Sequence, residues 1–144
     1  MTVEVTGGGL SISAPTGSVD LGSVAASSNT QVVTSSIGTI RVTDTRAGTA
    51  GWVATVGATD FTGPQNISVS ALGSVTYTPG QATVTGTANV TPTNEDHLYP
   101  TSPVQTATGV SGSNTAAWSP VIAVTIPASA LVGTYSTTIT HSVS

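Results

Sequence analysis

The chain has 144 residues, a length that fits one domain with a hydrophobic core of its own. Only 6% of the residues are charged and the net charge is -4, which excludes the basic surface that nucleic-acid binding requires and argues against binding to anionic membranes. The chain contains no cysteine, so disulfide frameworks, thiolate metal sites and a cysteine nucleophile are excluded as well.

The first part of the chain predicts short β-strands separated by turns. Val3 and Val5 alternate with polar residues, and a second alternating run spans residues 10–14. This period of two is typical of strands, because successive side chains point to opposite faces of a sheet. No signal peptide is visible before these runs, so we expect a mature, extracellular, cell-wall-associated protein from which the signal peptide has been removed. The alternative is a cytoplasmic protein.

Residues 38–58 carry the clearest pattern, with two alternating runs on either side of a turn-rich centre. Such a pattern predicts a β-hairpin. Ile40 and Val42 share one face of the first run, and Trp52 and Ala54 share one face of the second. Because a buried indole removes more apolar area from water than its neighbours do, we expect Trp52 to anchor the core.

Two short alternating runs follow at 67–71 and 75–77, and the dipeptide at 79–80 (Pro-Gly) ends the second one. Residues 79–116 contain four prolines and few alternating apolar residues. We therefore predict a long, irregular, loop-rich insertion over 79–116, of the kind that is functional or mobile when it occurs in a compact domain.

The one concentration of ionisable groups lies inside this stretch, where Glu95, Asp96 and His97 precede Tyr99. One interpretation is a loop tip whose charges are simply solvated. The other is a contact with a ligand or with Ca²⁺, because carboxylate oxygens are the ligands that hard cations take. The spacing does not match an EF-hand loop, so we predict neither a metal site nor a cofactor.

The pattern becomes regular again near Trp118, which opens a long strand, and a last strand spans residues 134–143. We expect His141 on that strand to be neutral, hydrogen-bonded and partly buried. The alternatives are a metal ligand or a pH-sensitive contact with a cell wall. One face of the last strand carries Tyr135, Thr137, Ile139, His141 and Val143, and the other carries Ser136, Thr138, Thr140 and Ser142.

Several of these segments occur in a recognisable order: V-T-D-T-R at 42–46, G-W-V-A at 51–54, G-T-Y at 133–135 and I-T-H-S-V at 139–143. In this order the chain resembles the WxL domain, a β-rich module of Gram-positive surface proteins that binds the cell wall non-covalently. The two Trp-x-Leu signatures of that family stand here as Trp-Val-Ala and His-Ser-Val. The resemblance implies that the motif and core residues are Trp52, Ala54, Tyr135, Ile139, His141 and Val143.

Together the patterns predict an all-β fold in which residues 1–144 form a single β-sandwich domain with Greek-key-like connections and few or no helices. The first and last major hairpins should pack together and bring Trp52 near the face of the last strand that carries Tyr135 and His141. No nucleophile elbow and no pair of suitably spaced carboxylates is visible, so we predict that the protein is not an enzyme.

Two functions compete. In the first, the protein binds peptidoglycan or another cell-wall polysaccharide, using aromatic faces that stack on sugar rings. In the second, it is a structural subunit that forms a homo-oligomer, filament or lattice with other surface proteins by pairing strand edges, because its sheets carry few charges to prevent such pairing. The candidate ligand-contacting residues are Glu95, Asp96, His97, Tyr99 and Trp118, with Tyr77 as a further aromatic.

Overall fold

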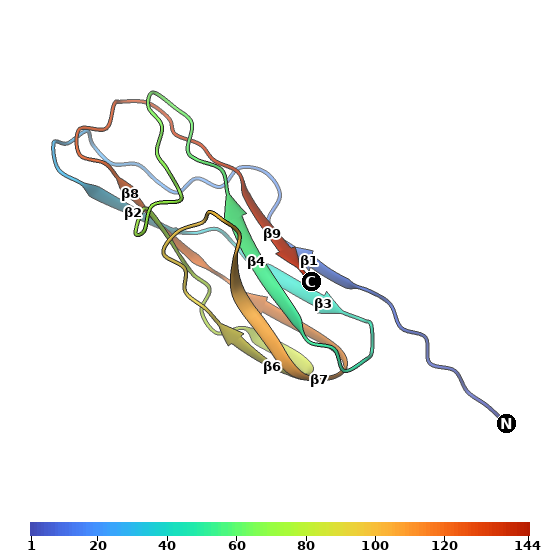
Figure 1. Cartoon of the computed structure of the whole chain (residues 1–144). Helices are drawn as coiled ribbons and strands as arrows, with labels where there is room; N and C mark the ends of the chain where they lie inside the picture. Colours follow the sequence, from blue (N-terminus) through green and yellow to red (C-terminus); the bar gives the residue numbers. More distant parts are fainter.

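A computed structural model describes all 144 residues and shows an all-β fold made of two antiparallel sheets (Figure 1). The predicted fold class is confirmed. No helix of the length and apolar character needed to cross a membrane is present. The strands are β1 Leu10–Ser13, β2 Gln31–Ser36, β3 Ile40–Asp44, β4 Trp52–Ala58, β5 Val75–Thr78, β6 Thr83–Pro92, β7 Ser102–Trp118, β8 Val121–Ile126 and β9 Ile139–Val143.

The larger sheet has the order β1-β3-β7-β4-β9, with β6 paired along β7, and the smaller sheet has the order β2-β8-β5. Most neighbours in these sheets are distant in sequence, as Greek-key-like connections require. Strand β7 lies between β3 and β4 and pairs with both. The hairpin predicted over residues 38–58 is therefore wrong: both strands form, but they pair with β7 instead of with each other.

The ribbon of β6 and β7 bends sharply, because glycines interrupt its regular backbone. Gly109 and Gly112 in β7 and Gly86 in β6 have φ values of +60°, +77° and +78°, a region that other residues avoid. The register between the two strands shifts twice near Gly86. As a result β3 and β4 run in opposite directions although both are antiparallel to β7, and the large sheet curls toward a barrel (Figure 1).

The prediction of an irregular insertion over 79–116 is wrong, because this stretch holds β6 and β7, the longest strand of the protein. Strand β6 is largely exposed and polar, so its sequence shows no simple alternation of apolar residues. The prediction of a strand at 67–71 is also wrong: only an isolated bridge joins Ile67 to Phe61 there.

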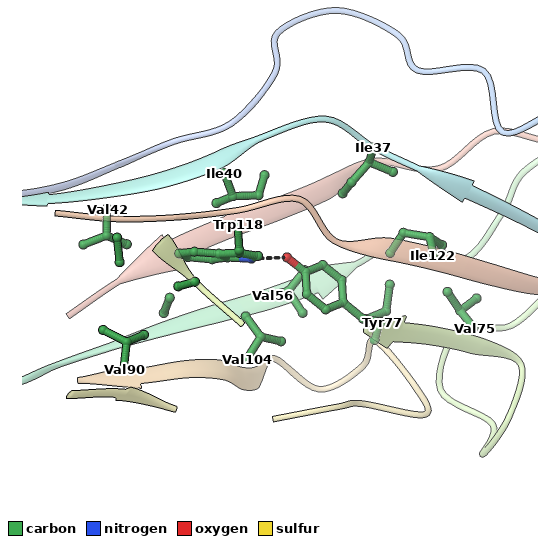
Figure 2. Packing of buried hydrophobic residues seen from close by; sticks show 14 of the residues in the cluster. Ile37, Ile40, Val42, Val56, Val75, Tyr77, Val90, Val104, Trp118 and Ile122 are labelled. Carbon is green, nitrogen blue, oxygen red and sulfur yellow. Dashed lines mark hydrogen bonds between the residues drawn. The ribbon is translucent and has the colours of Figure 1, made fainter. Parts of the chain in front are cut away.

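One hydrophobic cluster fills the space between the layers of sheet (Figure 2). Trp52 is 2% exposed and belongs to the same cluster as Ile40 and Val42 of β3, which are fully buried. The predicted role of Trp52 as a core anchor is confirmed. The smaller sheet contributes Val75 and Ile122 to the same interior, so the two sheets share one core.

Candidate functional site

The two motif-bearing strands come together as predicted. Strands β4 and β9 pair antiparallel, so that Ala54 lies opposite Val143 and Val56 lies opposite His141. Ala54 is fully buried, whereas His141 and Val143 are half-buried at the free side of the sheet. The last strand therefore lies beside the strand that carries Trp52, but by edge pairing within one sheet and not by the expected packing of two hairpins.

The other two motif residues also lie against the core. Ile139 begins β9, and Tyr135 lies in the connector before it, where its ring packs against the hydrophobic cluster. The Tyr135 hydroxyl donates a hydrogen bond of 2.7 Å to the carbonyl oxygen of Leu131. Tyr135 therefore stabilises the turn that brings the chain into its last strand.

A chain of hydrogen bonds links the two sheets through buried polar atoms. Trp118 Nε1 donates to Tyr77 Oη at 3.1 Å, a contact visible in Figure 2. Tyr77 Oη lies 2.9 Å from His141 Nε2. The phenol oxygen accepts a hydrogen bond from the indole N–H, and its own O–H can donate to Nε2 of the neutral imidazole tautomer that carries its hydrogen on Nδ1.

Burial sets the protonation states of the two titratable groups in this series of hydrogen bonds, His141 and Tyr77. Burial lowers the pKa of His141 to about 4 and raises the pKa of Tyr77. Both groups are therefore neutral at pH 7, in agreement with the first interpretation of His141. No group of three or more His, Asp or Glu side chains that could hold a metal ion is present in the structure.

The prediction that Trp118 contacts a ligand is wrong, because the residue is only 3% exposed. Tyr77 is fully buried and is also unable to present its ring to a sugar. The sequence placed both residues on apolar strand faces but could not show that the opposite sheet covers those faces. Among the predicted aromatic contacts, Tyr99 alone lies on the surface, with 62% of its area exposed.

The loop that joins β6 to β7 carries the remaining candidate residues and is held down by backbone hydrogen bonds. Glu95 exchanges two with Tyr77, of 2.7 and 2.9 Å. His97 Nδ1 lies 2.6 Å from Asp96 Oδ1, so these two side chains satisfy one another at the surface. Leu98 is buried, and its backbone is hydrogen-bonded to Val69 and to Ala58 at the end of β4. The loop is thus a fixed support that places Tyr99 beside the ends of β4 and β9.

A groove of about 260 Å³ lies next to Tyr99, between β4, β9 and this loop. Gly57 lies in its lining, where an added Cβ would come within 3.1 Å of Thr101 Oγ1. Thr140 and Ser142 are exposed on the outer face of β9. The lining contains no charged residue: Gly57, Ala58, Thr59, Leu98, Tyr99, Thr101, Thr138, Thr140 and Ser142.

A second depression, of about 420 Å³, lies near the end of β7 and is larger. Trp118 belongs to its lining but has its ring buried in the core, and Gln81 and Ser119 supply polar atoms. Because this depression offers no exposed aromatic face, the groove beside Tyr99 is the better candidate site.

A second buried polar cluster lies at the opposite end of the large sheet, within the V-T-D-T-R segment. Asp44 is 2% exposed and accepts two hydrogen bonds of 3.0 Å from the Arg46 guanidinium. Asn114 donates to the same carboxylate at 3.4 Å and accepts from Trp52 Nε1 at 3.0 Å. The Arg46 side chain holds the pKa of Asp44 below its ordinary value. This cluster satisfies the indole of the core and has a structural role.

No family model, curated protein or solved structure matches this chain.

Tyr99 was predicted from the sequence as a ligand contact, but most of the other residues that line the groove were not. Thr138, Thr140 and Ser142 were visible in the sequence as the polar face of the alternating last strand. Nothing in the sequence indicated that Gly57 and Thr101 would line the same groove. That proximity depends on the pairing of β4 with β9 and on the return of the loop over both.

Proposed function

We propose that the protein is a secreted bacterial surface module that binds peptidoglycan or an associated wall glycan without a covalent link, through the groove beside Tyr99. The observation that carries this proposal is the combination of an exposed aromatic ring with an uncharged, hydroxyl-rich lining. An aromatic face stacks on the apolar face of a sugar ring, and hydroxyl groups exchange hydrogen bonds with sugar hydroxyls.

The absence of charge in the lining favours the glycan strands of the wall over its anionic polymers. Phosphate or carboxylate groups are recognised by cationic side chains, and none lies in the groove. The sugar rings of a glycan strand fit better than an anionic wall polymer. The resemblance to the WxL domain supports the same class of ligand, since that family binds the cell wall non-covalently.

Co-sedimentation with purified cell-wall sacculi tests this proposal. We expect the protein to bind, Tyr99→Ala to lose most of that binding, and Tyr99→Phe to retain it, because the ring and not the hydroxyl group stacks on the sugar. Val132→Ala is a matched control, since it truncates another exposed apolar side chain outside the groove. Equal binding by Tyr99→Ala and Val132→Ala would exclude the groove as the binding site.

A second candidate function is self-association through strand edges. Strands β2 and β6 lie at sheet edges and contain no charged residue, although natural edges are usually protected by charges. A structural subunit would use such an edge to pair with another copy. Size-exclusion chromatography and electron microscopy of the protein alone distinguish the two functions: a monomer that binds sacculi supports the first, and ordered polymers without wall binding support the second.

A further inference from the structure

Residues 1–6 form a strand-like segment that has no partner in the protein. Val3 and Val5 alternate with polar residues and are 92% and 84% exposed. The segment runs away from the body of the molecule in an extended form (Figure 1). An extended run with alternating valines has the pattern of a strand, but here no second strand lies beside it.

The segment lacks a partner because β3 turns away from it. The ladder between β1 and β3 pairs Leu10 with Asp44, and Gly8 and Gly9 add two backbone hydrogen bonds to Thr45, of 2.6 and 2.9 Å. At that point the bidentate contact of Arg46 with Asp44 closes a turn. The polypeptide leaves the sheet after β3 at this point. Residues 1–6 therefore extend beyond the end of β3, the strand that pairs with β1.

Most free edges of the sheets are protected from pairing with another chain. Strand β6 is interrupted by Gly86 and two register shifts, which twist its edge. Strand β5 has Glu95 bonded to Tyr77 at its edge. Strands β1 and β9 face each other across the open side of the large sheet (Figure 1).

The outer edge of β2 has none of these protections. Residues Gln31–Ser36 pair with β8 in six consecutive positions without a bulge, and the strand contains neither proline nor a charged residue. Val32 is exposed on the outer face of β2, so the edge offers an apolar neighbour to the valines of an added strand on that face. A flat, regular, uncharged edge of this length is a template for another strand.

We propose that residues 1–6 of one copy pair with the outer edge of β2 in a second copy. This inference rests on the proposed self-association and names its contact. The segment has the alternating pattern of a strand, and neither it nor the outer edge of β2 has a backbone partner. They also lie at opposite ends of an elongated molecule (Figure 1). In such a head-to-tail contact each copy offers one donor strand and one acceptor edge, so the product is a polymer: a linear one, or a ring if the rotation between copies closes it.

Two variants separate donor from acceptor. Val3→Pro with Val5→Pro removes two backbone donors from a segment that contacts nothing in its own chain, so the fold is unaffected. Thr34→Lys places a charge on the exposed side of β2. We expect the wild-type protein to form polymers in sedimentation velocity and electron microscopy, and each variant alone to be a monomer. Val3→Ile with Val5→Ile is the matched control and should polymerise like the wild type.

Mixing the two variants is the decisive measurement. The proline variant retains a good edge and the lysine variant retains a good donor strand, so an equimolar mixture should form dimers of one copy of each and nothing larger. A mixture that stays monomeric would overturn the proposed contact, as would polymers formed by the proline variant alone. A wild-type protein that is monomeric at every concentration would overturn self-association altogether.

Discussion

Protonation of His141 should destabilise the fold over a defined range of pH. Burial lowers the pKa of His141 in the folded protein from 6.5 to about 4. Between these values the unfolded chain binds more protons than the folded one, so the free energy of unfolding rises with pH from about 4 to about 6.5. A shift of this size corresponds to about 3 kcal/mol of stability, which is present at neutral pH and lost on acidification.

The physical reason is that burial keeps water away from the imidazole ring, which penalises the charged imidazolium form. A protonated Nε2 can no longer accept a hydrogen bond from Tyr77, and no salt bridge to a carboxylate offsets the positive charge. Only the Asp44 carboxylate is buried, and its hydrogen-bond partners are Arg46 and Asn114.

Urea denaturation at several pH values measures this effect. The His141→Gln variant retains an acceptor for the Tyr77 proton but does not titrate, so its stability should vary little between pH 4 and 6.5. The His97→Gln variant should keep the slope of the wild-type protein, which assigns the slope to one of the two histidines. Equal slopes for the wild type and His141→Gln, or a His141 pKa near 6.5 by NMR, would refute the reasoning.

Two further predictions concern the core and the bend. Trp52→Ala should lower the free energy of unfolding by about 3–5 kcal/mol, measured by chemical denaturation, because it empties a buried site and leaves Asn114 Oδ1 without its donor; a loss below about 1 kcal/mol would contradict the burial of the indole. Gly112→Ala should cost about 1–2 kcal/mol because of its positive φ alone. Gly86→Ala should cost more in the same assay, since its Cβ would also collide with the carbonyl oxygen of Ser113; equal costs would contradict that close approach.

The strands that could be predicted are those whose alternation reports directly on burial. In β3 and β4 buried positions alternate with less buried ones, and apart from Asp44 the buried positions carry apolar residues: Ile40, Val42, Trp52, Ala54 and Val56. Strands β6 and β7 could not be predicted in this way. Their glycines carry bends, and much of β6 faces solvent, so threonine and glycine occupy positions that resemble a loop.

The candidate site likewise contains residues whose place could be predicted from the sequence and residues whose place could not. Tyr99 was found because an aromatic residue in a polar loop stands out in any sequence. The burial of Trp118 was not visible, because a strand places a side chain on one of two faces but does not determine which face a second sheet covers. The hydrogen bond from Trp118 to Tyr77 joins strands from different sheets, and only their packing brings the two residues together.

The order of residues alone determined that this chain forms β-sheets around Trp52, and that its surface depends on hydroxyl groups instead of charges. Both properties follow from local alternation and composition, which act along the chain. The tertiary structure decided which strands are neighbours, where the groove beside Tyr99 opens, and that residues 1–6 extend past the end of β3. These properties depend on contacts between residues far apart in sequence, and such contacts are set by the packing of two sheets against one core.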